Sequence, residues 1–140
     1  MEISMTEPVA KKILIIDDEP EFTEVLELNL QRTGLYKVEV ENDSEAALDT
    51  MRKVRPDLVL LDIVMPGVDG GDILAAIDAD PSLSSTPIIL VSALVSNSET
   101  GSDSVAHAGE RLIVAKPVKT ENLLRLIEES LQGGESADKS

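Results

Sequence analysis

The sequence predicts an α/β fold in which strands alternate with helices to form a doubly wound, parallel (βα)5 sheet. Four short runs are made of aliphatic residues alone, which is typical of strands that are covered on both faces in a parallel sheet. Amphipathic segments of helical length lie between these runs, and right-handed crossovers would place them on both faces of the sheet. The 140 residues suit one domain that buries a core of its own.

The expected strands are of two kinds. The four aliphatic runs are residues 13–16, 58–61, 88–91 and 112–115. Each run ends at a polar or charged residue, and these are Asp17, Asp62, Ser92 and Lys116. Residues 36–40 differ, because apolar and polar residues alternate there as they do in a half-exposed edge strand.

Helices are expected in the intervening segments 20–33, 44–54, 71–79 and 120–132. Each has apolar residues three and four positions apart, which places them on one face. The buried stripe expected on the first helix consists of Phe22, Val25, Leu26 and Leu30. Asp43 or Ser44 is expected to cap the second helix, and Thr120 the last helix, which should end before Gly133.

Three segments are expected to be poorly ordered or irregular. Residues 96–104 are rich in Ser, Asn and Gly where a fourth helix should lie, so that helix should be short or frayed. Residues 1–10 and 133–140 are expected to be flexible tails around a domain at 11–132.

The composition excludes several classes of protein. The formal net charge of −15 would repel phosphate backbones and anionic lipids, so we expect neither direct nucleic-acid binding nor a membrane partner. The absence of cysteine excludes disulfides and thiolate metal sites. No apolar run is long enough to span a membrane, and residues 1–10 lack the pattern of a signal peptide. We therefore expect a cytoplasmic protein.

The residues at the strand ends predict a site. In an open α/β sheet, ligands bind beyond the carboxyl ends of the strands, where Asp17 with Asp18, Asp62, Ser92 and Lys116 would converge. Three carboxylates would repel one another unless they surround a hard cation, and carboxylate oxygens suit Mg²⁺. An ammonium and a hydroxyl suit phosphoryl oxygens. The set therefore predicts phosphoryl transfer to a nucleophilic carboxylate.

Four motifs, taken in order, resemble the receiver domain of response regulators in two-component signalling. They are residues 14–20 (LIIDDEP), 62–70 (DIVMPGVDG), 91–93 (VSA) and 116–117 (KP). The resemblance covers about residues 11–131. It implies a flavodoxin-like sheet with strand order 2-1-3-4-5, and a signalling domain rather than a turnover enzyme. The implied partners are a sensor histidine kinase or histidine phosphotransfer protein and a downstream protein target.

The resemblance also implies a role for each matching residue. Asp62 looks like the phosphoacceptor, Lys116 like the lysine that pairs with a phosphoryl oxygen, and Ser92 like the hydroxyl that moves onto the phosphoryl group. The implied ligands of Mg²⁺ are Asp17, Asp18, Asp62 and the backbone carbonyl of Val64. One position departs from the family pattern, because Ile113 stands where receivers usually carry an aromatic switch residue.

Three other functions fit the sequence less well. A phosphatase of the haloacid-dehalogenase kind carries Asp-x-Asp after its first strand, whereas Asp17 and Asp18 are adjacent, and the chain has no room for a cap domain. A flavodoxin-like carrier of FMN needs phosphate donors where residues 17–21 are acidic, and it needs rings to stack the flavin. A degenerate receiver that only makes protein contacts is disfavoured by intact Asp18, Asp62 and Lys116.

Overall fold

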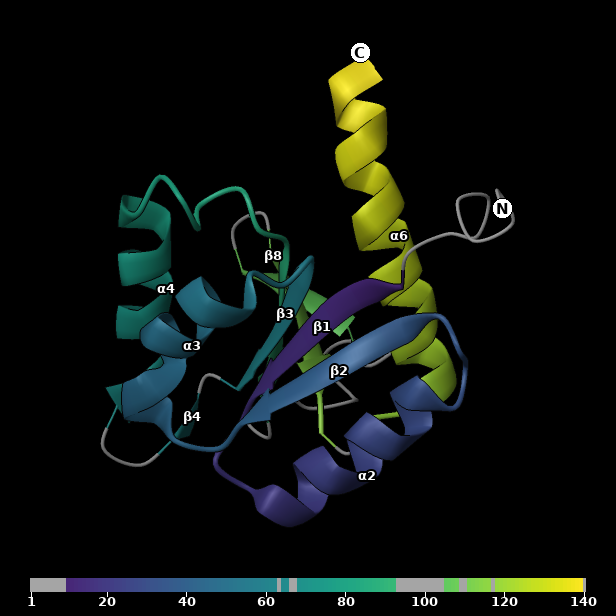
Figure 1. The fold of residues 1–140 in the computed structure, drawn as a ribbon, viewed down its shortest axis with the longest axis horizontal. Coiled ribbons are helices and arrows are strands. Elements are labelled where there is room, and N and C mark those ends of the chain that lie inside the picture. Colours follow the sequence, from purple (N-terminus) through teal and green to yellow (C-terminus); the bar gives the residue numbers. More distant parts are fainter. Residues whose placement is uncertain are drawn as a thin grey trace, which may run out of the picture.

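The computed structural model describes residues 10–62, 64–65, 68–92, 105–108, 111–116 and 118–139. A six-stranded sheet in the order β2-β1-β3-β6-β8-β7 forms the centre of the molecule. Helices α2 and α6 cover one face of the sheet, and α3 and α4 cover the other (Figure 1). The predicted doubly wound α/β architecture is confirmed.

The strands of the main sheet are β1 (Lys11–Ile16), β2 (Tyr36–Glu41), β3 (Leu58–Asp62), β6 (Ile88–Ser92), β7 (Val105–Ala108) and β8 (Arg111–Ala115). The first four and β8 pair in parallel, in the predicted order 2-1-3-4-5. Strand β2 lies at one edge, as its alternating pattern indicated. The parallel register sets Asp62 beside Val91 and Ser92 beside Ala115, so neighbouring strands end at the same edge of the sheet.

Three short strands were not predicted. Strand β7 pairs antiparallel with β8, beyond the five parallel strands. It satisfies backbone groups that an edge strand would otherwise leave unpaired, and four residues with two alanines gave too little periodicity to reveal it. A second sheet is a short antiparallel pair formed by β4 (Val64–Met65) and β5 (Val68–Asp69). The fourth helix expected at 96–104 lies outside the described residues, as do residues 1–9 of the expected N-terminal tail.

The helices are α2 (Pro20–Gln31), the 3₁₀ turn η1 (Ser44–Ala46), α3 (Ala47–Val54), α4 (Gly70–Ala79) and α6 (Thr120–Lys139). Asp43 caps η1, because its side chain accepts a hydrogen bond from the backbone N–H of Glu45 at 3.0 Å. The stripe predicted on α2 is wrong at Val25, which is 59% exposed. Thr23 is buried there instead, and its hydroxyl donates to the carbonyl of Pro20.

The last helix departs from the sequence prediction at both ends. It continues to Lys139, so the expected end before Gly133 is wrong and the expected tail at 133–140 is helical through Lys139. Glycine ends a helix when the chain turns to left-handed geometry, and otherwise costs only about 1 kcal/mol relative to alanine. Thr120 is the first helical residue rather than the cap before it, and its hydroxyl accepts a hydrogen bond from the Asn29 amide at 3.2 Å.

The core lies on both sides of the sheet. Ile13 and Ile15 of β1 point into a cluster with α2 and α6, whereas Leu14 and Ile16 point into a cluster with α3 and α4. All four are buried, as the continuous aliphatic run indicated. The two clusters hold the strands from both faces and so fix the positions of the residues at their carboxyl ends. Among the described residues, no helix combines the length and apolar character needed to cross a membrane.

Candidate functional site

The structure brings the predicted site residues together at the carboxyl edge of the sheet. Asp17 follows β1, Asp62 is the last residue of β3, Ser92 is the last residue of β6, and Lys116 follows β8. The backbone N–H of Lys116 donates to the carbonyl of Ser92 at 3.0 Å, which ties the ends of β8 and β6 to each other. Three strands of the parallel sheet and the loop after β8 thus supply one constellation.

Three carboxylates crowd this edge. One oxygen from each of Asp17, Asp18 and Asp62 lies within 4.8 Å of the others. Asp17 and Asp62 are almost fully buried, with 2% and 3% of their surface exposed, and Asp18 is half-buried. Like charges at this separation repel strongly when water cannot screen them.

Lys116 is the cation at the centre of the site. Its Nζ lies 2.9 Å from Asp17 Oδ2, 3.2 Å from Asp62 Oδ2 and 2.6 Å from Glu19 Oε1. The ring of Phe22 makes a further contact, with its centroid 4.5 Å from Nζ. Glu19 and Phe22 were not predicted as partners of the lysine, because neither contact leaves a signal in local sequence.

Burial and charge shift two pKa values in the site. Burial raises the pKa of the Asp17 carboxyl, and the charge of Asp62 adds to that, against the opposing effects of Lys116 and the Glu19 backbone N–H. Burial alone would lower the pKa of Lys116, but the hydrogen bond to Glu19, the close contact with Asp17 and the charges of Asp17 and Asp62 outweigh it and raise that pKa. Lys116 therefore stays protonated at any physiological pH.

The donor set fits a hard divalent cation. Asp17 Oδ2 is buried and accepts no well-aligned hydrogen bond, although the Lys116 ammonium lies 2.9 Å from it as an ion pair. A buried carboxylate oxygen without an aligned donor is a natural ligand for a metal ion. Asp18 and Asp62 could supply further oxygens beside it. The backbone carbonyl of Val64, in β4 two residues beyond Asp62, stays a prediction as a ligand.

A small polar network holds the acid pair in place. The Asn42 amide donates to the backbone carbonyl of Asp17 at 2.7 Å and to the hydroxyl of Thr23 at 3.1 Å. The backbone N–H of Glu19 donates to Asp17 Oδ1 at 2.9 Å. The loop after β1 is therefore fixed to the end of β2 and to the first turn of α2. The roles of Asn42 and Thr23 could not be predicted from the sequence, because a single amide or hydroxyl has no motif of its own.

The two residues of the expected switch, Ser92 and Ile113, lie on the neighbouring strands β6 and β8. Ser92 is fully buried. Ile113 of β8 is partly buried and packs against the cluster on the side of α3 and α4. In the parallel register Ile113 is paired with Leu90, two residues before Ser92. The movement of the Ser92 hydroxyl stays a prediction.

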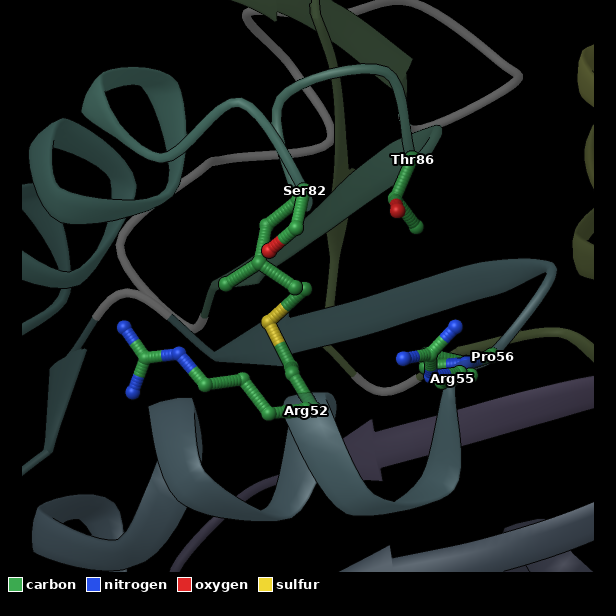
Figure 2. Close-up of a pocket in the computed structure, with 7 residues that line it drawn as sticks. Arg52, Arg55, Pro56, Ser82 and Thr86 are labelled. Carbon is green, nitrogen blue, oxygen red and sulfur yellow. The ribbon is translucent and has the colours of Figure 1, made fainter.

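A separate hollow of about 390 Å³ lies at the opposite edge of the sheet. Figure 2 shows Arg52 and Arg55 on one side of this hollow, with Ser82 and Thr86 across from them. Met51 also lines it. Residue 56 precedes β3 and residue 86 precedes β6, so this hollow is far along the strands from the acid cluster. It contains none of the predicted site residues, and Arg52 is already paired with Asp80 at 3.1 Å.

The family model for the response regulator receiver domain matches residues 13–128. The chain belongs to the response regulator receiver family. It is similar to the DNA-binding response regulator MtrA of Mycolicibacterium smegmatis, with 33% identity over 89% of this chain and 52% of that protein. This receiver thus spans about half the length of that curated relative.

Solved structures agree with this family. A receiver domain of a signal transduction histidine kinase from Syntrophus aciditrophicus is 28% identical, covering 89% of this chain and 92% of that one, with a TM-score of 0.71. The chemotaxis response regulator CheY4 of Vibrio cholerae, 24% identical over 87% and 99% of the two chains, shares the fold with a TM-score of 0.71. These relatives are described as a DNA-binding regulator, a histidine kinase and a chemotaxis regulator, so membership in the family does not identify the output of this receiver.

Proposed function

We propose that this receiver accepts a phosphoryl group on Asp62 in a Mg²⁺-dependent reaction and signals through altered protein contacts. The donor would be a phosphohistidine on a sensor histidine kinase or histidine phosphotransfer protein. The observation that carries the proposal is the position of the Lys116 ammonium, 3.2 Å from Asp62 Oδ2 and 2.9 Å from Asp17 Oδ2, beside the three clustered carboxylates. A cation, an acid cluster and a buried carboxylate together suit phosphoryl transfer.

The residues of the chain have distinct tasks in this reaction. A carboxylate oxygen of Asp62 attacks phosphorus in line, the bond from phosphorus to the histidine nitrogen breaks, and the imidazole leaves. Lys116 pairs with a phosphoryl oxygen and neutralises charge that develops in the transition state. Asp17 and Asp18 would hold Mg²⁺, which supplies electrostatic stabilisation when it is bound. Water later cleaves the acyl phosphate and regenerates Asp62.

The modified site then has to change the surface. We assign Ser92 the hydroxyl that donates to a phosphoryl oxygen, because it is buried at the end of the strand next to β3. Ile113, at the position where receivers usually carry a ring, can fill space vacated near Ser92 but cannot expose a polar group. The change should therefore be concentrated in the chain that follows Ser92.

The proposal treats the protein as a signalling domain and not as a turnover enzyme on a small molecule. Its output is contact with a downstream protein in the cytoplasm. The net charge of −15 argues against nucleic acid or an anionic membrane as a direct partner of this segment.

Labelling with a small phosphodonor tests the proposal. Incubation with acetyl phosphate and Mg²⁺ should add the mass of one phosphoryl group, and chelation of the metal should prevent it. Asp62→Asn should abolish labelling. Asp57→Asn is a matched control, because Asp57 precedes the same strand at its other end and is exposed. Full labelling of Asp62→Asn at another residue would refute the assignment.

A further inference from the structure

Lys116 must keep its position while its surroundings change. Its ammonium contacts the carboxylates of Asp17, Asp62 and Glu19. Two of these, Asp17 and Asp62, belong to the acid cluster that fits a divalent cation. When a cation binds there, it competes with the lysine for the same oxygens and repels the ammonium. The lysine needs a partner that the cation cannot take.

The ring of Phe22 has the properties of such a partner. Its centroid lies 4.5 Å from Lys116 Nζ, well within the distance at which the electron-rich face of an aromatic ring attracts a cation. Phe22 lies in the first turn of α2 and packs against the core on that side, so the fold fixes the position of the ring. The third acidic partner, Glu19, is an exposed side chain, and solvent weakens its hold on the lysine.

We infer that Phe22 is a positioning residue that holds the Lys116 ammonium toward Asp62 by a cation–π contact, an inference that rests on the proposed phosphoryl transfer. The ring attracts the lysine without offering an oxygen to the metal, so it keeps the ammonium in place when Asp17 and Asp62 are engaged. Phe22 does not touch the transferred group and acts only through Lys116.

The sequence makes this contact unusually easy to test, because Phe22 is the single phenylalanine of the chain. Protein produced with ring-fluorinated phenylalanine analogues therefore changes at residue 22 alone. Fluorine withdraws electron density from the ring face while nearly preserving shape, so increasing fluorination should weaken attraction to a cation without removing the packing. A residue that serves only to fill the core would not respond in this graded way.

The main measurement is the rate of Asp62 labelling by acetyl phosphate at saturating Mg²⁺. The rate should fall in the order of increasing fluorination, by roughly three- to tenfold at the fully fluorinated ring. The labelling rate of Phe22→Leu should be lower by a similar factor, and Phe22→Tyr should keep most of the wild-type rate. Tyr36→Leu is the control, because Tyr36 packs against the same core cluster and should leave the rate unchanged when it loses its ring.

Two further readouts separate positioning from packing. If Phe22 acts only through its contact with Lys116, that contact is already lost in Lys116→Ala. Adding Phe22→Leu to Lys116→Ala should therefore cause no further loss of the labelling rate. In the wild type, the ring should shift the NMR signals of the Lys116 ε-methylene protons upfield, and Phe22→Leu should remove that shift.

The outcomes are distinct. The role of Phe22 would be overturned if the rate of Asp62 labelling were equal across the fluorinated series. It would also be overturned if each decrease in that rate simply followed a decrease in the melting temperature of the same protein. Either result would leave the phosphorylation of Asp62 intact. A Lys116 ε-methylene signal that is the same with and without the ring would overturn it as well. Failure of the wild type to become labelled on Asp62 would instead contradict the proposed function, and the positioning role with it.

Discussion

The acidic side chains at the two edges of the sheet differ in their hydrogen-bond partners. At the amino edge, the carboxylates have well-aligned partners: Asp80 accepts from Arg52 and from Ser82, and Asp57 accepts from the backbone N–H of Lys12 at 2.7 Å. At the carboxyl edge, three aspartates cluster, two of them share the ammonium of Lys116, and Asp17 Oδ2 is buried without an aligned donor.

The pKa values of Asp80 and Asp17 are shifted in opposite directions, in line with this difference. Hydrogen bonds from Ser82 and Arg52 lower the pKa of Asp80, since they stabilise its charged form. Burial raises the pKa of Asp17, since its charged form is less well solvated in the fold. At the amino edge, aligned hydrogen bonds stabilise the charged form of Asp80, whereas at the carboxyl edge Asp17 and Asp62 share the single ammonium of Lys116. Carboxylates that are crowded at a fixed place, with few aligned donors, are the kind of ligand set that suits a divalent cation.

Removing the ammonium at the centre of the site should have the largest effect on the stability of the protein. In Lys116→Ala, Asp17 and Asp62 remain buried near each other without the charge of Lys116, so the free energy of unfolding without metal should fall by about 3 kcal/mol. Mg²⁺ should restore much of the loss, because it neutralises the same carboxylates. Urea unfolding with and without Mg²⁺ measures both effects. Lys119→Ala, an exposed neighbour, is the control; equal metal-free stability of the two variants would contradict the prediction.

Metal binding should have the next largest effect. We expect Mg²⁺ to bind the folded cluster and not the unfolded chain, so it should stabilise the wild type by about 1.4 kcal/mol at a concentration roughly tenfold above its Kd. Asp18→Ala should weaken that response and raise metal-free stability by relieving repulsion. Thermal unfolding over a Mg²⁺ titration measures this. The acid pair is not the metal site if Asp18→Ala and the wild type respond equally, with Asp49→Ala as an exposed control.

The amino edge should give the smallest effect, with a defined dependence on pH. The folded pKa of Asp80 lies below its ordinary value of 3.8. Its carboxylate therefore contributes stability above pH 3.8 that is lost as the pH falls through the lower, folded pKa. Asp80→Asn should be slightly less stable than the wild type at neutral pH and should converge with it in acid. A gap in melting temperature that persists or widens in acid would contradict this.

Much of the carboxyl edge could be predicted from the sequence. A continuous aliphatic run such as residues 58–61 identifies a buried strand, and the polar residue after it must lie at the strand end. Asp17, Asp62, Ser92 and Lys116 could therefore be assigned to one edge from residue patterns alone, because parallel strands end on the same side. The same local reasoning failed at Val25 and Gly133, where orientation and helix length depend on neighbours that periodicity does not describe.

From the sequence alone, one could predict the succession of the five parallel strands, the edge at which the polar residues collect and the family to which the domain belongs. Which side chains contact one another within that edge depends on the tertiary structure. Lys116 meets Glu19 across 97 positions of sequence, and the ring of Phe22 reaches the same ammonium from the first turn of α2. Asn42 reaches the carbonyl of Asp17 from the end of another strand. Such contacts are set by how helices and loops pack on the sheet, and a pattern of period two or 3.6 along one segment carries no information about them.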